Sequence, residues 1–161
     1  MSIHTAKRLS FKSLMLFPWL AICLCHANET VFVPKAQLVT DNVYAIIGPL
    51  GQRSLANAGL NANYGFVVTD KGVILIDSGA SAHSAALLEK AISQVTAKPV
   101  RWVLNTGSQD HRWLGNEYFA RKGAQIQALA ETVQTQKTHG ELQIAGLTRF
   151  VGDQMKGTQV Q

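Results

Sequence analysis

An acid and an imidazole stand side by side at Asp110 and His111, the only adjacent pair of this kind in the 161-residue chain. They belong to a polar stretch, residues 105–116, that runs Asn-Thr-Gly-Ser-Gln-Asp-His-Arg-Trp-Leu-Gly-Asn. A carboxylate beside an imidazole can bind a metal ion or move a proton. The same pair is more often a solvated turn or a helix cap, so the surrounding elements must decide between these interpretations.

Apolar segments on both sides predict the elements that hold this stretch. Residues 100–104 (Val-Arg-Trp-Val-Leu) predict a buried strand directly before it. Residues 113–122 predict a short helix after it, which Gly123 ends. Polar residues between the end of a strand and the start of a helix are the common building site of α/β enzymes.

A hairpin and a crossover helix are predicted before this strand. Two apolar, β-branched runs, 64–69 and 73–77, flank a short turn that ends in glycine. A helix follows that Ser81 can cap, with its apolar residues spaced along one stripe. Further strands are predicted at 31–33, 39–47 and 124–129. The strand–helix–strand order implies a parallel crossover, so the fold class is α/β with a mixed sheet.

Two segments are open to more than one interpretation. Residues 48–63 are rich in glycine and lack periodicity, which is typical of a lid or binding loop but also of an unstructured connection. Residues 131–161 are polar and weakly helical, with expected breaks at Gly140, Gly146, Gly152 and Gly157.

The first 27 residues have the layout of a secretory signal. Lys7, Arg8 and Lys12 precede an apolar run, residues 14–25, and Ala27 is a small residue suited to cleavage. The run is shorter than the roughly 20 residues of a membrane span. Cleavage after Ala27 would leave residues 28–161 as the mature domain, periplasmic or secreted, and an uncleaved membrane anchor is the alternative.

Residues 1–27 also contain both cysteines and account for most of the excess of basic over acidic residues. The formal net charge is +5, but residues 28–161 carry 12 basic and 10 acidic residues. No basic patch of the kind that binds nucleic acid remains. Both cysteines, Cys23 and Cys25, lie in the signal segment. The mature domain is therefore expected to contain neither a disulfide nor a thiolate metal site.

Together these features resemble the metallo-β-lactamase superfamily. The evidence is a hairpin ending in Leu-Ile-Asp-Ser-Gly at 75–79, the crossover helix, and the stretch from Asn105-Thr106 through Asp110-His111 to Gly115-Asn116. In that family the loop reads Asn-Thr-His-x-His-x-Asp-His. The resemblance covers about residues 39–129 and implies an αββα sandwich, of which the N-terminal half is expected here. It also implies descent from zinc-dependent hydrolases.

The resemblance implies a set of zinc ligands that this chain retains only in part. The two histidines of the first zinc site correspond to Gly107, which has no side chain, and Gln109, whose neutral amide is a poor zinc ligand. Asp110 and His111 correspond to the start of the second site. They are the candidate residual zinc ligands, and Asp110 is also the candidate catalytic residue. Asp77 is expected to order the loop by accepting hydrogen bonds from it.

The other histidines of the mature chain are His83 and His139. His83 starts the crossover helix and is a third candidate ligand, whereas His139 is expected to be exposed. Zinc normally has at least three protein ligands, and the motif supplies two. We therefore expect a catalytically impaired relative of the zinc hydrolases, and whether the chain is an enzyme stays open.

Two alternatives belong to other classes: a non-enzymatic periplasmic binding or interaction module, and a degraded gene fragment. Half of a sandwich would expose an apolar sheet face, expected to include Phe66, Val68, Ile74 and Ile76. A second copy of the chain or another protein would cover such a face.

Overall fold

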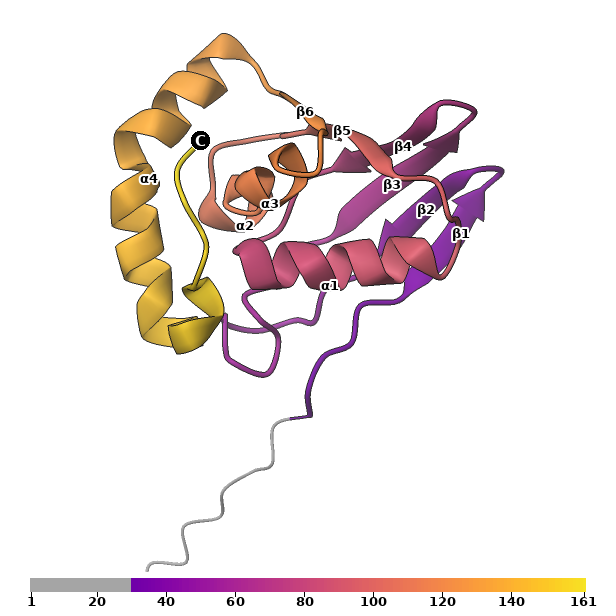
Figure 1. Cartoon of the computed structure of the whole chain (residues 1–161). Helices are drawn as coiled ribbons and strands as arrows, with labels where there is room; N and C mark the ends of the chain where they lie inside the picture. Colours follow the sequence, from indigo (N-terminus) through magenta and orange to yellow (C-terminus); the bar gives the residue numbers. More distant parts are fainter. Residues whose placement is uncertain (1–29) are drawn as a thin grey trace, which may run out of the picture.

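The computed structural model describes residues 30–161, and the predicted signal segment lies outside this range. A six-stranded mixed sheet forms the centre of the molecule (Figure 1). The first four strands pair antiparallel with one another, whereas the fifth pairs parallel with the fourth and the sixth parallel with the fifth. The α/β class is confirmed. In sheet order the strands are β1 (Ala36–Thr40), β2 (Val43–Ile46), β3 (Tyr64–Thr69), β4 (Gly72–Ile76), β5 (Val100–Leu104) and β6 (Gln125–Gln127).

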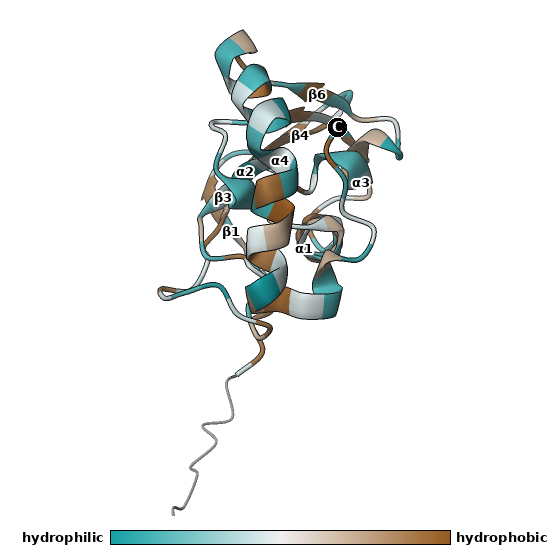
Figure 2. Cartoon of the chain, turned by 90° about the vertical axis from the view of Figure 1, so that its left-hand side faces the viewer, coloured by the Kyte–Doolittle hydropathy of each residue, from teal (hydrophilic) through white to brown (hydrophobic). Residues whose placement is uncertain are grey.

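The helices lie along one face and one end of this sheet. α1 packs with α3, the long α4 packs against α2, and the 3-10 turn η1 returns the chain to α1 (Figure 1). Figure 2 looks onto α4, whose residues alternate between hydrophilic and hydrophobic along the ribbon. The bounds of the helices are α1 (Ala82–Ser93), α2 (Asp110–Trp113), α3 (Asn116–Ala120), α4 (Ala130–Val151) and η1 (Gly152–Met155).

The predicted hairpin and crossover are confirmed. β3 and β4 pair antiparallel, α1 follows, and β5 lies parallel to β4. Ser81 caps α1 because its hydroxyl accepts a hydrogen bond from the Ser84 amide at 3.1 Å, while the Ser84 hydroxyl accepts one from the Ser81 amide at 2.8 Å. This reciprocal arrangement satisfies two amides that a helix start otherwise leaves unpaired.

The prediction of one strand over 39–47 was wrong. The chain turns at Asp41 and Asn42 and forms a hairpin from β1 and β2. Asn42 has a φ of 63°, a left-handed conformation that asparagine adopts more readily than most residues. Residues 31–33 are not in a strand.

The main hydrophobic core lies between the sheet and the helices. Phe66 and Leu75 pair across β3 and β4 and are fully buried together with Leu88 of α1 and Phe119 of α3. Val68 packs against the same cluster. Phe66 and Val68 therefore belong to the covered face, and the prediction that they are exposed was wrong.

The opposite face of the sheet carries a second set of apolar side chains. The strand register aligns Val67, Ile74 and Trp102 in one row and places Ile76 beside Leu104 in the next. These five side chains are half-buried. Within the described residues they belong neither to the main core nor to a second, smaller cluster around Trp113 and Leu147. The prediction of an open apolar face thus holds for Ile74 and Ile76, which alternate with the core residues along β4.

Helix α4 continues through two glycines that were predicted to interrupt it. It runs for 22 residues and includes both Gly140 and Gly146. Gly140 is buried, and a Cβ atom added there would overlap Cγ2 of Val160 and lie 2.9 Å from the ring of Trp113. The missing side chain therefore lets α4 approach α2 closely, and this packing outweighs the low helix propensity of glycine.

We expect Gly140→Ala to lower the free energy of unfolding by about 1–2 kcal/mol, because its methyl group would overlap Val160 and crowd Trp113. The control is Gly146→Ala in the same helix, where an added Cβ meets nothing within 4 Å. That change should raise stability by roughly 0.5–1 kcal/mol through helix propensity. Denaturant unfolding measures both values, and an equal gain in the two variants would show that Gly140 is not a packing contact.

Candidate functional site

Residues from three separate segments meet at the carboxyl ends of β4 and β5: Asp77, the stretch 105–111 and Arg53. Asp77 follows β4, and residues 105–109 follow β5, its parallel neighbour. Asp110 and His111 form the first turn of α2, so the predicted helix starts three residues earlier than expected and breaks at Gly115. The Asp110 carboxylate accepts a hydrogen bond from the His111 amide at 2.8 Å, which favours a helix start at this point.

Arg53 joins this pair from the aperiodic segment 48–63. Its Nη2 atom donates a hydrogen bond to Oδ1 of Asp110 and lies 2.9 Å from Nδ1 of His111. The His111 nitrogen is 3.3 Å from the same carboxylate oxygen. The segment predicted to be a lid or a loose connection thus supplies a cation to the candidate site.

Partial burial and these partners determine the charge of Asp110. Burial raises the pKa of the carboxyl group, but the hydrogen bond with His111 and the charge of Arg53 lower it by more. The net result is a pKa below the ordinary value. Asp110 is therefore ionised at neutral pH and forms an ion pair with Arg53.

We expect Arg53→Met to lower the free energy of unfolding at pH 7 by about 1–2 kcal/mol, because the pair is partly shielded from water. A carboxyl group with a lowered folded-state pKa stabilises the fold above its unfolded pKa, near 3.9, and loses this effect as the pH falls through the folded pKa. The loss caused by the substitution should therefore shrink below about pH 4. Unfolding curves at several pH values measure it.

Arg149→Met is the matched control for this prediction, since Arg149 is exposed on α4 and appears in no ion pair of the described residues. Its effect should be small and independent of pH. A pH-independent loss in Arg53→Met would contradict an ion pair with Asp110.

Asp77 connects β4 to the loop after β5. Its carboxylate accepts hydrogen bonds from the amide and the hydroxyl of Thr106, each at 2.7 Å, and lies 3.5 Å from Nη1 of Arg112. The side chain of Asp77 is buried, so these partners offset the cost of removing its charge from water. Asp77 orders the start of the 105–111 loop through Thr106.

Tyr64 supports the same loop from β3. Its hydroxyl donates a hydrogen bond to the carbonyl oxygen of His111 at 3.1 Å. Burial raises the pKa of Tyr64, and the negative charge of Asp77 raises it further. Tyr64 therefore stays protonated and acts as a fixed donor.

Glutamines of α4 hold the middle of the loop. Nε2 of Gln136 donates to the carbonyl oxygen of Gly107 at 3.2 Å, and Nε2 of Gln143 donates to that of Ser108 at 2.9 Å. The Gln143 oxygen accepts the indole N–H of Trp113 at 2.9 Å. We did not predict these residues. The spacing of Gln136, Gly140 and Gln143 at i, i+4 and i+7 places them on one helix face and was the available signal.

A buried amide cluster closes the base of the loop. Asn105 and Asn116 exchange hydrogen bonds through their side chains at 2.8 and 3.1 Å. The Ser78 hydroxyl donates to Asn116 at 2.8 Å, and a second Asn105 contact reaches the carbonyl of Arg112 at 3.1 Å. Each of these groups satisfies the others away from water, which makes the cluster rigid.

The structure does not bring the remaining candidate residues to this cluster. His83 is exposed near the start of α1 and lines a separate groove. His139 is exposed on α4. Within residues 30–161, no three histidine, cysteine or acidic side chains are grouped so that they could hold a metal ion.

Comparison with known proteins shows which family part of this chain is similar to. Residues 58–133 match the family model described as the metallo-beta-lactamase superfamily. A search among curated proteins found no significant match.

Two solved structures show the similarity of fold. One is the metallo-beta-lactamase FIM-1 from Pseudomonas aeruginosa in its mono-zinc form, with a TM-score of 0.56, 18% identity, and coverage of 69% of this chain and 48% of that chain. The other is a metallo-beta-lactamase from Erythrobacter litoralis with beta-mercaptoethanol in its active site, with a TM-score of 0.56, 18% identity, and coverage of 67% and 46%. The chain spans about half the length of these structures.

Proposed function

We propose that the chain is an exported, catalytically impaired relative of the zinc-dependent hydrolases, because residues 58–133 match the metallo-beta-lactamase superfamily model and the fold is similar to that of two metallo-beta-lactamases. The observation that carries this proposal is the contact of Arg53 with Asp110 and His111. Asp110 and His111 occupy the two motif positions whose side chains could still bind a metal ion, and the guanidinium group of Arg53 contacts both of them.

The residues of the motif do not fit a zinc ion. Gly107 offers no donor, and Gln109 is an exposed neutral amide. Asp110 and His111 are two donors, and a zinc site needs at least three from the protein. A dication on Asp110 would also meet the charge of Arg53 on the same oxygen, and like charges at this distance repel strongly in a partly buried site.

The proposal assigns a structural role to the residues that resemble a catalytic site. Asp110 and His111 keep the positions of metal ligands, and Asp110 that of a catalytic residue, but they bind Arg53. Asp77 accepts its hydrogen bonds from Thr106 and faces Arg112, so it orders the loop. Neither carboxylate is therefore left free to hold the metal ion that would activate a water molecule in a zinc-dependent hydrolase.

Metal binding tests this proposal. We expect the purified protein to carry less than about 0.1 zinc per chain and to show no rise in melting temperature with added zinc, because binding to the folded state would raise it. The matched comparison is the triple variant R53Q/G107H/Q109H, which restores donors and removes the cation, and which should gain a zinc-dependent rise. Stoichiometric zinc in the unmodified protein that Asp110→Ala abolishes would overturn the proposal.

Export rests on the layout of residues 1–27. We assign them as a signal peptide cleaved after Ala27 and residues 28–161 as the mature domain, in the periplasm or outside the cell. Within the described range, no helix has both the length and the apolar character to cross a membrane. Amino-terminal sequencing of protein recovered from the periplasm should begin at Asn28, and an intact amino terminus would contradict cleavage.

The open sheet face favours a second candidate function, a non-enzymatic interaction module. Val67, Ile74 and Trp102 form an apolar row there that a second copy of the chain or another protein would cover. If the protein is an interaction module, it should form an assembly through this face, and Trp102→Lys should weaken that assembly. An impaired hydrolase needs no such assembly. Light scattering of the two proteins at equal concentration discriminates between these candidates.

A further inference from the structure

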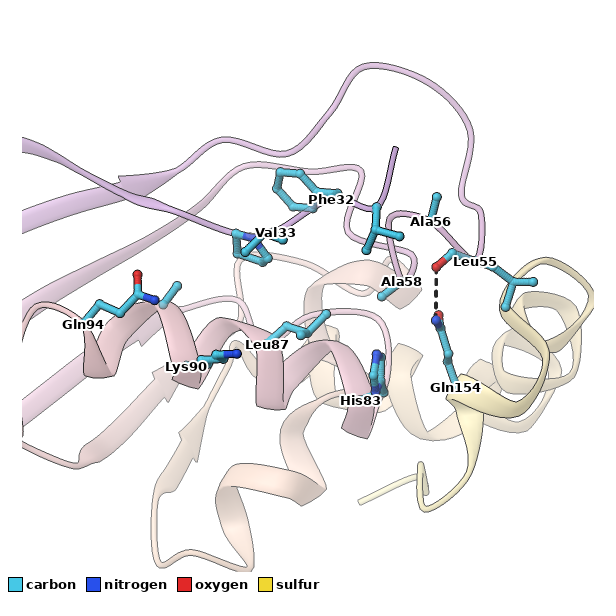
Figure 3. Close-up of a pocket in the computed structure, with 13 residues that line it drawn as sticks. Phe32, Val33, Leu55, Ala56, Ala58, His83, Leu87, Lys90, Gln94 and Gln154 are labelled. Carbon is cyan, nitrogen blue, oxygen red and sulfur yellow. Dashed lines mark hydrogen bonds between the residues drawn. The ribbon is translucent and has the colours of Figure 1, made fainter. Parts of the chain in front are cut away.

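We infer that a groove beside α1 binds a small apolar carboxylate, at a site separate from the Asp110 cluster. The groove has a volume of about 150 Å³ and lies between residues 31–34, residues 55–58, α1 and Gln154 of η1 (Figure 3). Gln154 closes one end, where its Nε2 atom donates to the carbonyl oxygen of Leu55 at 3.1 Å. None of the lining residues belongs to the 105–116 loop.

Helix α1 presents apolar side chains to this groove. Leu87 and Ala91 line it; Ala91 belongs to the main core, and Leu87 packs against that core but is only partly buried. Leu87 faces Phe32, which is also only partly buried, on the other side of the groove (Figure 3). The groove therefore borders the main core, and Leu87 and Phe32 leave part of their apolar surface uncovered there.

The rim of the groove exposes apolar side chains to water. Val31, Val33 and Leu55 all line it and are 70%, 57% and 60% exposed. Single exposed apolar residues are common, but their grouping around a hollow is a feature of binding sites. An apolar ligand in the groove would remove part of this surface from water.

One unpaired cation determines the charge of the expected ligand. Lys90 lines the groove and takes part in no ion pair of residues 30–161, while its neighbour Glu89 pairs with Lys122. The lining contains no acidic residue. A carboxylate on the ligand would therefore find an attractive charge and no opposing one, with the stem of Lys90 packing along the apolar wall.

The volume limits the size of the ligand. A cavity of about 150 Å³ in another protein accommodates benzene. The groove is of that size, so we expect a carboxylate with about six to eight carbons, such as benzoate or hexanoate. The apolar part would lie between Phe32 and Leu87, and the carboxylate at Lys90.

Titration with benzoate, followed by amide chemical shifts of the purified protein, tests this inference. We expect saturable shifts at residues of α1 and of the 31–34 segment. Lys90→Gln should weaken benzoate binding about fivefold, the most that a partly exposed ion pair usually contributes. Leu55→Ala should weaken benzoate and its neutral analogue benzyl alcohol equally, because it removes apolar wall only.

Two controls separate the charge from the pocket. Lys137→Gln removes an exposed lysine of α4 that does not line the groove, and it should leave benzoate binding unchanged. Benzyl alcohol should bind Lys90→Gln as well as the unmodified protein, which also shows that the groove is intact in the variant. Shifts that do not saturate, shifts centred elsewhere, or equal benzoate affinity in Lys90→Gln and Lys137→Gln would each overturn the inference.

Discussion

Asn116→Ala is expected to lower the free energy of unfolding by about 3–4 kcal/mol, a large part of the stability of a domain this size. The Asn116 side chain makes three hydrogen bonds, to the hydroxyl of Ser78 and twice to the amide of Asn105, and it is only 4% exposed. Its removal would take one hydrogen-bond partner from the Ser78 hydroxyl and two from the Asn105 side chain, which would keep only their contacts with Arg112 and Gln136. A buried polar group that loses its partner costs about 1–3 kcal/mol before relaxation. Chemical denaturation with a two-state fit measures the loss.

The control for this prediction is Asn63→Ala. Asn63 is exposed and accepts one hydrogen bond, from the Gly48 amide at 3.2 Å. Its substitution should cost less than about 1 kcal/mol, because water replaces the lost partner. Similar losses in the two variants would show that the buried cluster contributes no more than an exposed contact does.

Gly115→Ala is expected to destabilise the protein by about 3 kcal/mol. Gly115 has a φ of −82° and a ψ of −1°, which alanine adopts without difficulty, so backbone strain is not the reason. An added Cβ atom would instead overlap the carbonyl oxygen of Ser78 and approach the Cβ atom of Ala85 to 2.9 Å. Neither atom can move freely, because Ser78 lies in the buried connection between β4 and α1 and Ala85 is buried within α1.

Gly107→Ala tests whether the effect depends on these rigid neighbours. An added Cβ atom there would meet Oε1 of Gln109 at 2.6 Å and Cδ of Arg112 at 3.2 Å, both in long side chains. Such side chains can rotate away, so the expected cost is below about 1 kcal/mol. Thermal unfolding of both variants provides the comparison, and a loss at Gly107 as large as that at Gly115 would contradict the packing argument.

These two predictions concern the groups that shape the 105–116 loop. Its base is held by the amide cluster of Asn105 and Asn116, its start by Asp77, and its middle by glutamines of α4. Arg53 holds its end. The loop is thus ordered throughout by protein groups. This supports the proposal that the residues at the motif positions have a structural role.

Local patterns in the sequence determined the central elements. The hairpin over β3 and β4, the Ser81 cap of α1 and the parallel strand β5 were all predicted, because β-branched runs, a turn and a cap act within a few residues. The positions of Gly107, Gln109, Asp110 and His111 in the family motif follow from the sequence in the same way. These four residues motivated the expectation of impaired catalysis before any geometry was known.

Only the tertiary structure decided which groups meet. Arg53 precedes Asp110 by 57 residues and lies in a segment without periodicity, so nothing local indicates their contact. The strands β3 and β4 are apolar at nearly every position, and the packing of α1 and α3 alone selected Phe66 and Val68 for the core. Helix α4 continues through Gly140, where the missing side chain leaves room for Val160 and Trp113 to pack against the helix. In each case a contact between distant residues outweighed a weak local preference, and such contacts form only when the chain is folded.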